Sequence, residues 1–411
     1  MSDQKLFGMS AEKGRWIYII LCLIMYLCLG SVYSYSIFLP EIKSQFGISA
    51  SMGNLPFMLF LFFFSILMFF GGKMMGKFGP RKLALIGGLI VGLGWALSYA
   101  ATESKSITLL CLTYGVVAGG GVGLAYGAPI AIAGRWFPDR KGLAVGLMLA
   151  GFGGSALITG KLAGILIPSA GLSMAFLYFG IAFAIILFLL ALPLRLPENN
   201  WKPAGWNPPA GSAAAVELET GQMIKSSTFW GLFLCYVIGC LSGLMAIGIS
   251  KPVGNEVIKI AGEVATTLVG IFAIFNALGR PLFGALTDKI TPRWAAILNL
   301  SMMLVVSLMM LAAGEGSVII YVVAFCGFWL TLGGWLAIAP TATATFFGIK
   351  HYAQNYGVVF LAYGLGAILG GIISGQAKDV LGSYQYAFYP TAGLAIVGLA
   401  IALLFIKPVK K

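Results

Sequence analysis

The sequence predicts an all-α polytopic membrane protein with twelve transmembrane helices in two six-helix halves. Three observations support this fold class. Of the 411 residues, 59% are hydrophobic and only 9% are charged, whereas a soluble domain carries about 25% charged residues. The apolar runs are long and continuous, which excludes an outer-membrane barrel with its short alternating strands. A similar short basic loop also occurs once in each half of the chain.

The apolar runs place the spans in order along the chain. A helix that crosses the bilayer needs about 20 apolar residues. The expected spans are 15–39, 52–72, 84–101, 106–134, 143–168, 172–196, 228–250, 262–286, 293–313, 317–345, 355–376 and 384–406. The longest polar stretch, 197–227, is rich in Pro, Gly, Ala and Asn and is typical of a linker. It separates an N-terminal half, 1–196, from a C-terminal half, 228–411.

The distribution of basic residues predicts the orientation in the membrane. An even number of spans places both termini on one side, and most of the 26 Lys and Arg residues fall on that side. The loops on the opposite side contain Lys43, Lys105, Lys251, Lys259 and Lys378. Cytoplasmic loops carry the excess of Lys and Arg. We therefore expect a multi-pass protein of the plasma (inner) membrane, with cytoplasmic termini and linker. The net charge of +13 reflects this topology, and we expect no nucleic-acid partner.

The repeated loop indicates that the two halves are duplicates. Residues 72–81 read GKMMGKFGPR and residues 284–293 read GALTDKITPR. Gly, Lys, Pro and Arg coincide at one fixed offset, and both loops follow the second span of their half. Internal repeats of this kind are common in secondary transporters.

Both loops resemble the signature of the major facilitator superfamily, G-x-x-x-D-[RK]-x-G-R-[RK]. The resemblance assigns a conformational role to the loop residues Gly72, Lys77, Arg81, Asp288, Lys289 and Arg293. Gly76 occupies the acidic position in the first loop. The superfamily implies a monomer that works by alternating access, with two halves rocking around a central site.

A second motif points to a narrower group. Residues 136–151, WFPDRKGLAVGLMLAG, resemble the span-5 signature of the monocarboxylate transporter family. The form WFPDRKG also resembles the bacterial oxalate/formate antiporter branch of the superfamily. Residues 354–357, QNYG, at the start of span 11, and Trp206 with Pro208 in the linker indicate the same branch.

Arg280 is the main candidate for binding substrate. All thirteen acidic residues fall in loops, in tails or at the very end of a span, and Lys161 and Arg280 are the charged residues in the interior of the expected spans. Arg280 precedes Asp288 by eight residues, which places it about 12 Å inside a core about 30 Å thick. A charge at this depth should face a water-filled cavity, and a guanidinium fits a carboxylate bidentately. The alternative is a structural arginine that binds backbone carbonyls.

Asn276 lies one helical turn before Arg280, on the same face. Its amide could orient the guanidinium or bind the anion, or it could instead connect two helices. By its resemblance to the monocarboxylate family, this position corresponds to an aspartate that is implicated in proton coupling there. The span-1 lysine of that family also has no counterpart here, because Tyr33 lies near its place.

The resemblance to the oxalate carrier suggests the size of the substrate. That carrier uses two cavity cations, which correspond to Arg280 and Tyr363 here, and one cation suits one carboxylate. Aromatic residues of its cage correspond to Phe152, Leu332, Leu336 and Phe360, while Tyr33 and Tyr126 remain as possible hydroxyl donors. We therefore expect a more aliphatic cavity that accepts a short acid such as lactate or pyruvate.

These observations predict a secondary active transporter of a small monocarboxylate, with Arg280 binding the carboxylate. Proton-coupled symport is the expected mode, and carboxylate exchange of the oxalate/formate type is the alternative. The spans hold no constellation of acid, base or metal ligands, so we expect neither an enzyme nor a cofactor nor a metal. The expected partners are the carboxylate, protons and the lipid bilayer.

Overall fold

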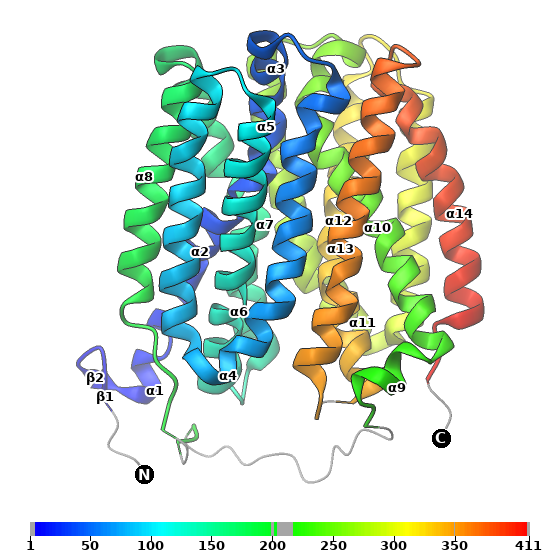
Figure 1. The fold of residues 1–411 in the computed structure, drawn as a ribbon. Helices are drawn as coiled ribbons and strands as arrows, with labels where there is room; N and C mark the ends of the chain where they lie inside the picture. The colour runs from blue at the N-terminus through cyan, green and yellow to red at the C-terminus, as the bar shows by residue number, and fades with distance from the viewer. Residues whose placement is uncertain (1–4, 199–200, 204–216, 349, 409–411) are drawn as a thin grey trace.

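The computed structural model describes residues 5–198, 201–203, 217–348 and 350–408. Apart from the connecting segments and one hairpin of two-residue strands, these residues are helical, which confirms the predicted all-α class. The long helices run roughly alongside one another (Figure 1). The hairpin near the N-terminus and the end of the last helix lie at the same end of the bundle, here called the terminal end; the opposite end is the far end. Trp206 and Pro208 fall outside the described residues.

The first group of elements, here called the N bundle, extends from the hairpin to α8. Its elements are β1 (Lys5–Leu6), β2 (Met9–Ser10), α1 (Ala11–Gly14), α2 (Ile17–Leu29), η1 (Gly30–Ser34), α3 (Tyr35–Phe46), α4 (Ala50–Glu103), α5 (Ile107–Leu110), η2 (Cys111–Ala118), α6 (Gly119–Trp136), α7 (Lys141–Ala170) and α8 (Leu172–Ala191). The segments α2–η1–α3 form one span, and α5–η2–α6 form another.

The second group, here called the C bundle, follows the predicted linker. Its elements are α9 (Thr220–Ile224), α10 (Ser227–Val253), η3 (Gly254–Ile258), α11 (Gly262–Leu311), α12 (Val318–Phe347), α13 (Tyr352–Asp379), η4 (Tyr384–Ala387) and α14 (Phe388–Phe405). The domain boundaries proposed from the sequence, at 196/197 and 227/228, stay a prediction.

Among the described residues, ten helical segments are long and apolar enough to cross a membrane. Two of them, α4 with 54 residues and α11 with 50, are far longer than one crossing needs. A helix rises about 1.5 Å per residue, so each of these two exceeds twice the thickness of the hydrocarbon core. Counting each as two passes gives the twelve expected.

The two repeated motifs form sharp elbows within these long helices. The sequence placed a loop at each position, but the helix continues to a single non-helical residue, Gly79 in α4 and Thr291 in α11. Pro80 and Pro292 follow directly, and a residue before proline is disfavoured in the helical region. The loops are therefore one-residue turns at equivalent points of the repeat.

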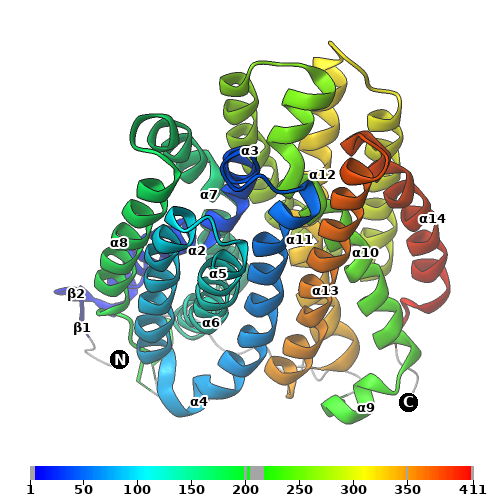
Figure 2. The same ribbon diagram turned by 45° about the horizontal axis from the view of Figure 1, so that its top comes forward.

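The two bundles meet along two main pairs of helices. Helix α4 contacts α13, and α7 contacts α11. Figure 2 shows the first half of α4 beside α13. Helices α3 and α10 also meet. Side chains on these helices form the boundary between the bundles, where the central site lies.

Candidate substrate-binding site

Arg280 lies in α11 and is buried, with only 3% of its surface exposed. Its Nε, Nη1 and Nη2 atoms have no hydrogen-bond partner among the described residues. The Tyr126 hydroxyl lies beside the guanidinium, but not in a geometry that satisfies its N–H groups. An uncompensated buried charge costs several kcal/mol, so this position favours an anion.

An aromatic ring of the other bundle lies next to Arg280. The Cζ atom of Arg280 lies 5.7 Å from the ring centroid of Phe152 in α7, within the usual range of a cation–π contact. Phe152 in turn lies 5.2 Å from the ring of Tyr33 and 5.4 Å from the ring of Tyr126. The structure therefore brings four of the expected site residues together at the boundary between the bundles.

A ring of aromatic side chains surrounds this point. Phe64 of α4 lies 5.0 Å from Tyr126 and 5.4 Å from Phe360 of α13. The rings of Phe360 and Tyr363 stack at 5.0 Å. We call the following set the central aromatic cluster: Tyr33, Phe64, Tyr126, Phe152, Trp329, Phe360 and Tyr363.

The central aromatic cluster joins the bundles through a hydrogen bond. The hydroxyl groups of Tyr33 in η1 and Tyr363 in α13 lie 2.9 Å apart, and both side chains are fully buried. The charge of Arg280 also acts on the hydroxyl of Tyr33. Tyr363 was expected to correspond to a cavity lysine of the oxalate carrier. In this structure the residue supplies a hydroxyl group in place of a second cation.

Asn276 connects two helices in this structure. Its Nδ2 donates a hydrogen bond of 2.9 Å to the carbonyl of Trp329 in α12. Its Oδ1 has no hydrogen-bond partner among the described residues and faces Gly153 of α7, where a Cβ would lie 2.7 Å from that oxygen. The Nδ2 atom of Asn276 therefore connects two helices, as one of the two interpretations from the sequence proposed. The Oδ1 atom, one helical turn from Arg280 in the sequence, is still free to accept a hydrogen bond.

The two leucines of α12 occupy less central positions. Leu332 is buried and packs against Gly243 of α10, where a side chain would collide with it. Leu336 lies one turn further along and is 6% exposed. The more aliphatic cavity stays a prediction, and the aromatic side chains of Phe64 and Trp329 belong to the surroundings of the site.

Sequence reasoning missed Phe64 and Trp329. Phe64 belongs to the run of aromatic and aliphatic residues at 57–70, where every face of the helix is apolar and periodicity gives no direction. Trp329 lies 6.1 Å from Tyr33, and its Nε1 donates to the Ser250 hydroxyl at 3.1 Å. The signal that could have identified Trp329 is its indole N–H group, which needs a hydrogen-bond partner when the ring is buried.

The repeated loop residues lie away from the site, at the terminal end. Gly72, Lys77 and Arg81 are exposed, and so are Asp288 and Lys289. No ion pair within 4.0 Å forms at Asp288 among the described residues. Arg293 is partly buried and its Nη2 donates to the carbonyl of Leu403. The conformational role of this motif stays a prediction.

Residues 136–140, WFPDR, bind Arg15 at the terminal end of the N bundle. Arg15 is 4% exposed and binds both carboxylate oxygens of Asp139, at 2.6 and 2.9 Å. It also donates to the carbonyl of Trp136 at 3.0 Å and lies over the ring of Phe137. Burial raises the pKa of Asp139, but the hydrogen bond and charge of Arg15 outweigh it, so that the net pKa lies below its ordinary value. This explains the aspartate that departs from the monocarboxylate signature.

Two carboxylates join the bundles at the far end. Glu256 of η3 pairs with Lys43 of α3 at 3.4 Å and with Lys378 of α13 at 2.5 Å. The carboxylate of Asp379 accepts hydrogen bonds from the backbone N–H groups of Ala50 and Ser51, at the start of α4. These contacts hold the far end closed in this structure.

The fold and this site define a class of protein. The chain is a polytopic helical membrane protein with repeated elbows in its two bundles, and it buries an unpaired arginine between them. The family model of the Major Facilitator Superfamily matches residues 19–347 and 255–411. The chain belongs to the Major Facilitator Superfamily, a family of membrane transporters.

Similar proteins extend this assignment. The chain is 29% identical to the oxalate:formate antiporter of Oxalobacter formigenes, over 97% of this chain and 94% of that protein. It is 24% identical to monocarboxylate transporter 14 of Mus musculus, over 82% and 78%. It is 27% identical to apicoplast pyruvate carrier 1 of Toxoplasma gondii, over 71% and 63%.

One solved structure shows the same fold. A bacterial homologue of the human lysosomal transporter Spinster, in an inward-facing and unoccupied conformation, superposes with a TM-score of 0.71. It covers 95% of this chain and 97% of its own, at 16% identity. This similarity concerns the fold alone.

Proposed function

We propose that the protein transports a small monocarboxylate of the lactate or pyruvate type across the plasma (inner) membrane by alternating access. The observation that supports this proposal is Arg280, whose three guanidinium nitrogens are buried without a hydrogen-bond partner in the part of the chain that the structure describes. A carboxylate would accept two parallel hydrogen bonds from the guanidinium and cancel its charge. The names of the similar carriers, which refer to oxalate, formate, monocarboxylate and pyruvate, fit an organic anion.

The surroundings of Arg280 favour a small acid. Phe152 covers one side of the guanidinium, and the Tyr33–Tyr363 hydrogen bond crosses the site. The rings leave an apolar wall for a short aliphatic tail, and the hydroxyl of Tyr126 could donate a further hydrogen bond to the carboxylate. Binding would neutralise the buried charge and so lower the cost of closing the bundles around it.

Proton-coupled symport is the proposed mode, as in the monocarboxylate family. The described spans hold no acidic residue beside Arg280, so the proton would travel on the substrate or on water next to the arginine. Exchange of one carboxylate for another is the second candidate. Two observations favour exchange: the similarity to the oxalate:formate antiporter and the lone cation, which would then never cross the membrane without an anion.

Transport into proteoliposomes separates the two modes. The measurement is uptake of radiolabelled L-lactate into vesicles with an inward proton gradient, compared with lactate-loaded vesicles at equal pH on both sides. Symport predicts accumulation driven by the gradient in empty vesicles. Exchange predicts uptake only into loaded vesicles, at a rate that does not depend on the gradient. Uptake in neither case would contradict the proposed substrate.

We also propose that the protein acts as a monomer without enzymatic activity or cofactor, with its termini and its 197–227 linker in the cytoplasm. The excess of Lys and Arg at the terminal end supports this orientation. Protease digestion of sealed inside-out vesicles tests it directly. Cleavage within the linker in these vesicles, but not in right-side-out vesicles, is the expected result.

A further inference from the structure

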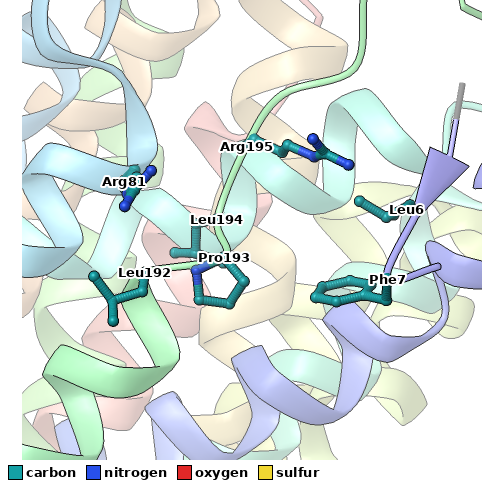
Figure 3. A pocket seen from close by; sticks show the side chains of 7 residues that line it. All are labelled: Leu6, Phe7, Arg81, Leu192, Pro193, Leu194 and Arg195. Carbon is teal, nitrogen blue, oxygen red and sulfur yellow. The ribbon is translucent and has the colours of Figure 1, made fainter.

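A cavity of about 280 Å³ lies at the terminal end of the N bundle, away from the central aromatic cluster. Three separate elements form it: Leu6 and Phe7 of the hairpin, Arg81 of α4, and residues 192–195 after α8. Figure 3 shows Arg81 above Leu192 and Arg195 above Leu194, with Phe7 beside Pro193. The cavity therefore combines two cations with an apolar surface.

The structure fixes Arg195 firmly in this wall. Its Nη2 donates a hydrogen bond of 2.6 Å to the carbonyl of Lys5, which holds the hairpin against the segment after α8. Its carbonyl accepts a hydrogen bond of 2.7 Å from Trp136 Nε1, and its backbone N–H donates to the Tyr18 hydroxyl at 3.3 Å. Because these contacts already fix the backbone and the side chain of Arg195, its guanidinium loses little conformational entropy when it binds an anion.

Arg81 supplies the second charge. It is exposed, and it forms no ion pair within 4.0 Å among the described residues. No acidic residue lines the cavity. Guanidinium groups without a carboxylate in the cavity wall attract an anion, and their planar set of N–H donors suits the oxygens of a phosphate.

The hairpin, and Trp16 directly before α2, expose apolar side chains at the same end of the bundle as the cavity. Phe7 is 37% exposed, Met9 40% and Trp16 37%. The hairpin and α1 lie to the side of α8, at the level where the helices end (Figure 1). Aromatic and apolar side chains at this level insert into the boundary between headgroups and acyl chains.

We propose that this cavity binds an anionic phospholipid in the leaflet at the terminal end. Arg81 and Arg195 hold the headgroup phosphate, and Phe7 and Leu192 contact the start of the acyl chains. Basic cavities between membrane helices bind anionic headgroups in this way. The exposed apolar residues beside the cavity favour a lipid over a soluble phosphate, because a soluble ligand gains nothing from them. The inference does not depend on which substrate the protein transports.

Native mass spectrometry of the purified full-length protein in detergent tests the proposal. The probes are phosphatidylglycerol and phosphatidylcholine, titrated separately. We expect phosphatidylglycerol to be retained preferentially, and Arg81→Gln and Arg195→Gln each to weaken that binding about fivefold. Lys225→Gln, which removes an exposed charge outside the cavity, should leave binding unchanged. Equal binding in wild type and both arginine variants would overturn the proposal.

A second measurement separates a lipid from a free phosphate. Glycerophosphoglycerol carries the same headgroup without acyl chains, and it should not displace the lipid at millimolar concentration. Phe7→Ser should weaken phosphatidylglycerol binding. Displacement by the free headgroup, together with unchanged lipid binding in Phe7→Ser, would indicate a soluble phosphate site and refute the lipid assignment. Arg81→Gln keeps the test valid if Arg195→Gln disturbs folding, because only Arg195 anchors the hairpin.

Discussion

The hydroxyl groups of Tyr33 and Tyr363 lie 2.9 Å apart and form a hydrogen bond between the two bundles. Both residues are fully buried and both belong to the central aromatic cluster around Arg280. A contact at this position must break or move whenever the bundles rock apart at the site. It therefore contributes to the relative stability of the conformation described here.

Tyr363→Phe should weaken this conformation by about 1 kcal/mol, the usual net value of one hydrogen bond. The expected result is a roughly fivefold change in the apparent KM for substrate, without loss of folded protein. The measurement is the concentration dependence of uptake into proteoliposomes. Tyr114→Phe is the matched control, because the Tyr114 hydroxyl is buried without a partner. A change of the same size in the apparent KM of Tyr114→Phe would contradict a specific role for the Tyr33–Tyr363 hydrogen bond.

Arg280→Lys should abolish most transport while the protein still inserts and folds. Lysine keeps the charge but loses the planar pair of donors, and charge-assisted hydrogen bonds contribute about 1.5–3 kcal/mol each. We expect at least a tenfold loss of uptake, and loss of the thermal stabilisation that substrate gives to the wild type. Arg135→Lys, an exposed arginine of α6, serves as the control. Full activity in Arg280→Lys would place the carboxylate site elsewhere.

Glu256→Gln should favour opening at the far end. It removes the partner of Lys43 in the N bundle and of Lys378 in the C bundle. Partly exposed ion pairs contribute about 0–1 kcal/mol each, so the shift in population should be several-fold at most, and high salt should reproduce it in the wild type. Spin labels at Ser44 and Glu263, with distances measured by electron–electron resonance, report it. Glu315→Gln, an exposed acidic residue of the far end, should leave the distances unchanged.

Asp139→Asn should destabilise the N bundle, because it leaves the buried Arg15 with only the longer contact of 3.4 Å to the half-exposed carboxylate of Glu12. Removing one partner of a buried pair costs about 3–5 kcal/mol. Because the pKa of Asp139 is lowered in the folded state, its contribution is present above the unfolded pKa, about 3.9, and is lost as the pH falls through the lower folded value.

Thermal unfolding at pH 7 and near pH 3 checks the Asp139 prediction. Asp139→Asn should unfold at a lower temperature than wild type at pH 7, and the difference should shrink toward pH 3. Asp288→Asn, which removes an exposed acidic group at the same end, should match wild type at both pH values. A difference between Asp139→Asn and wild type that is independent of pH would contradict the assigned role of the ionised carboxylate.

Thr291→Gly should stabilise the protein. Thr291 has φ 76° and ψ 154°, and its counterpart Gly79 has φ 72° and ψ 168°. This region is essentially restricted to glycine and costs other residues about 1–3 kcal/mol. Thr291→Gly should therefore raise the apparent unfolding temperature, and the reciprocal Gly79→Thr should lower it. An unchanged or lower temperature in Thr291→Gly would show that the threonine is held there without strain.

The sequence indicated the charged residue of the candidate site better than the aromatic residues around it. Arg280 could be found because a charge within an apolar span stands out against its surroundings. Phe64 could not, since it lies in a helix that is apolar on every face. The direction of each ring depends on how α4, α7 and α13 pack, and no local pattern in the sequence records that packing.

Asn276 illustrates a different limit. The sequence placed it correctly on the same face as Arg280, one turn away, but left two partners open for its amide. The choice of the Trp329 carbonyl depends on the close approach of α11 and α12. That approach is set by residues more than 50 positions apart in the chain, which a single sequence cannot align.

The sequence by itself determined the membrane class and the long apolar helices, because burying apolar surface in lipid requires long continuous runs whatever the tertiary packing. It also singled out Arg280, for which we propose an anion as the binding partner. Only the tertiary structure decided that Tyr33 meets Tyr363, that Glu256 joins Lys43 to Lys378, and that the hairpin and Arg81 enclose a cavity with Arg195. These contacts join distant segments, and their geometry follows from helix packing between and within the bundles.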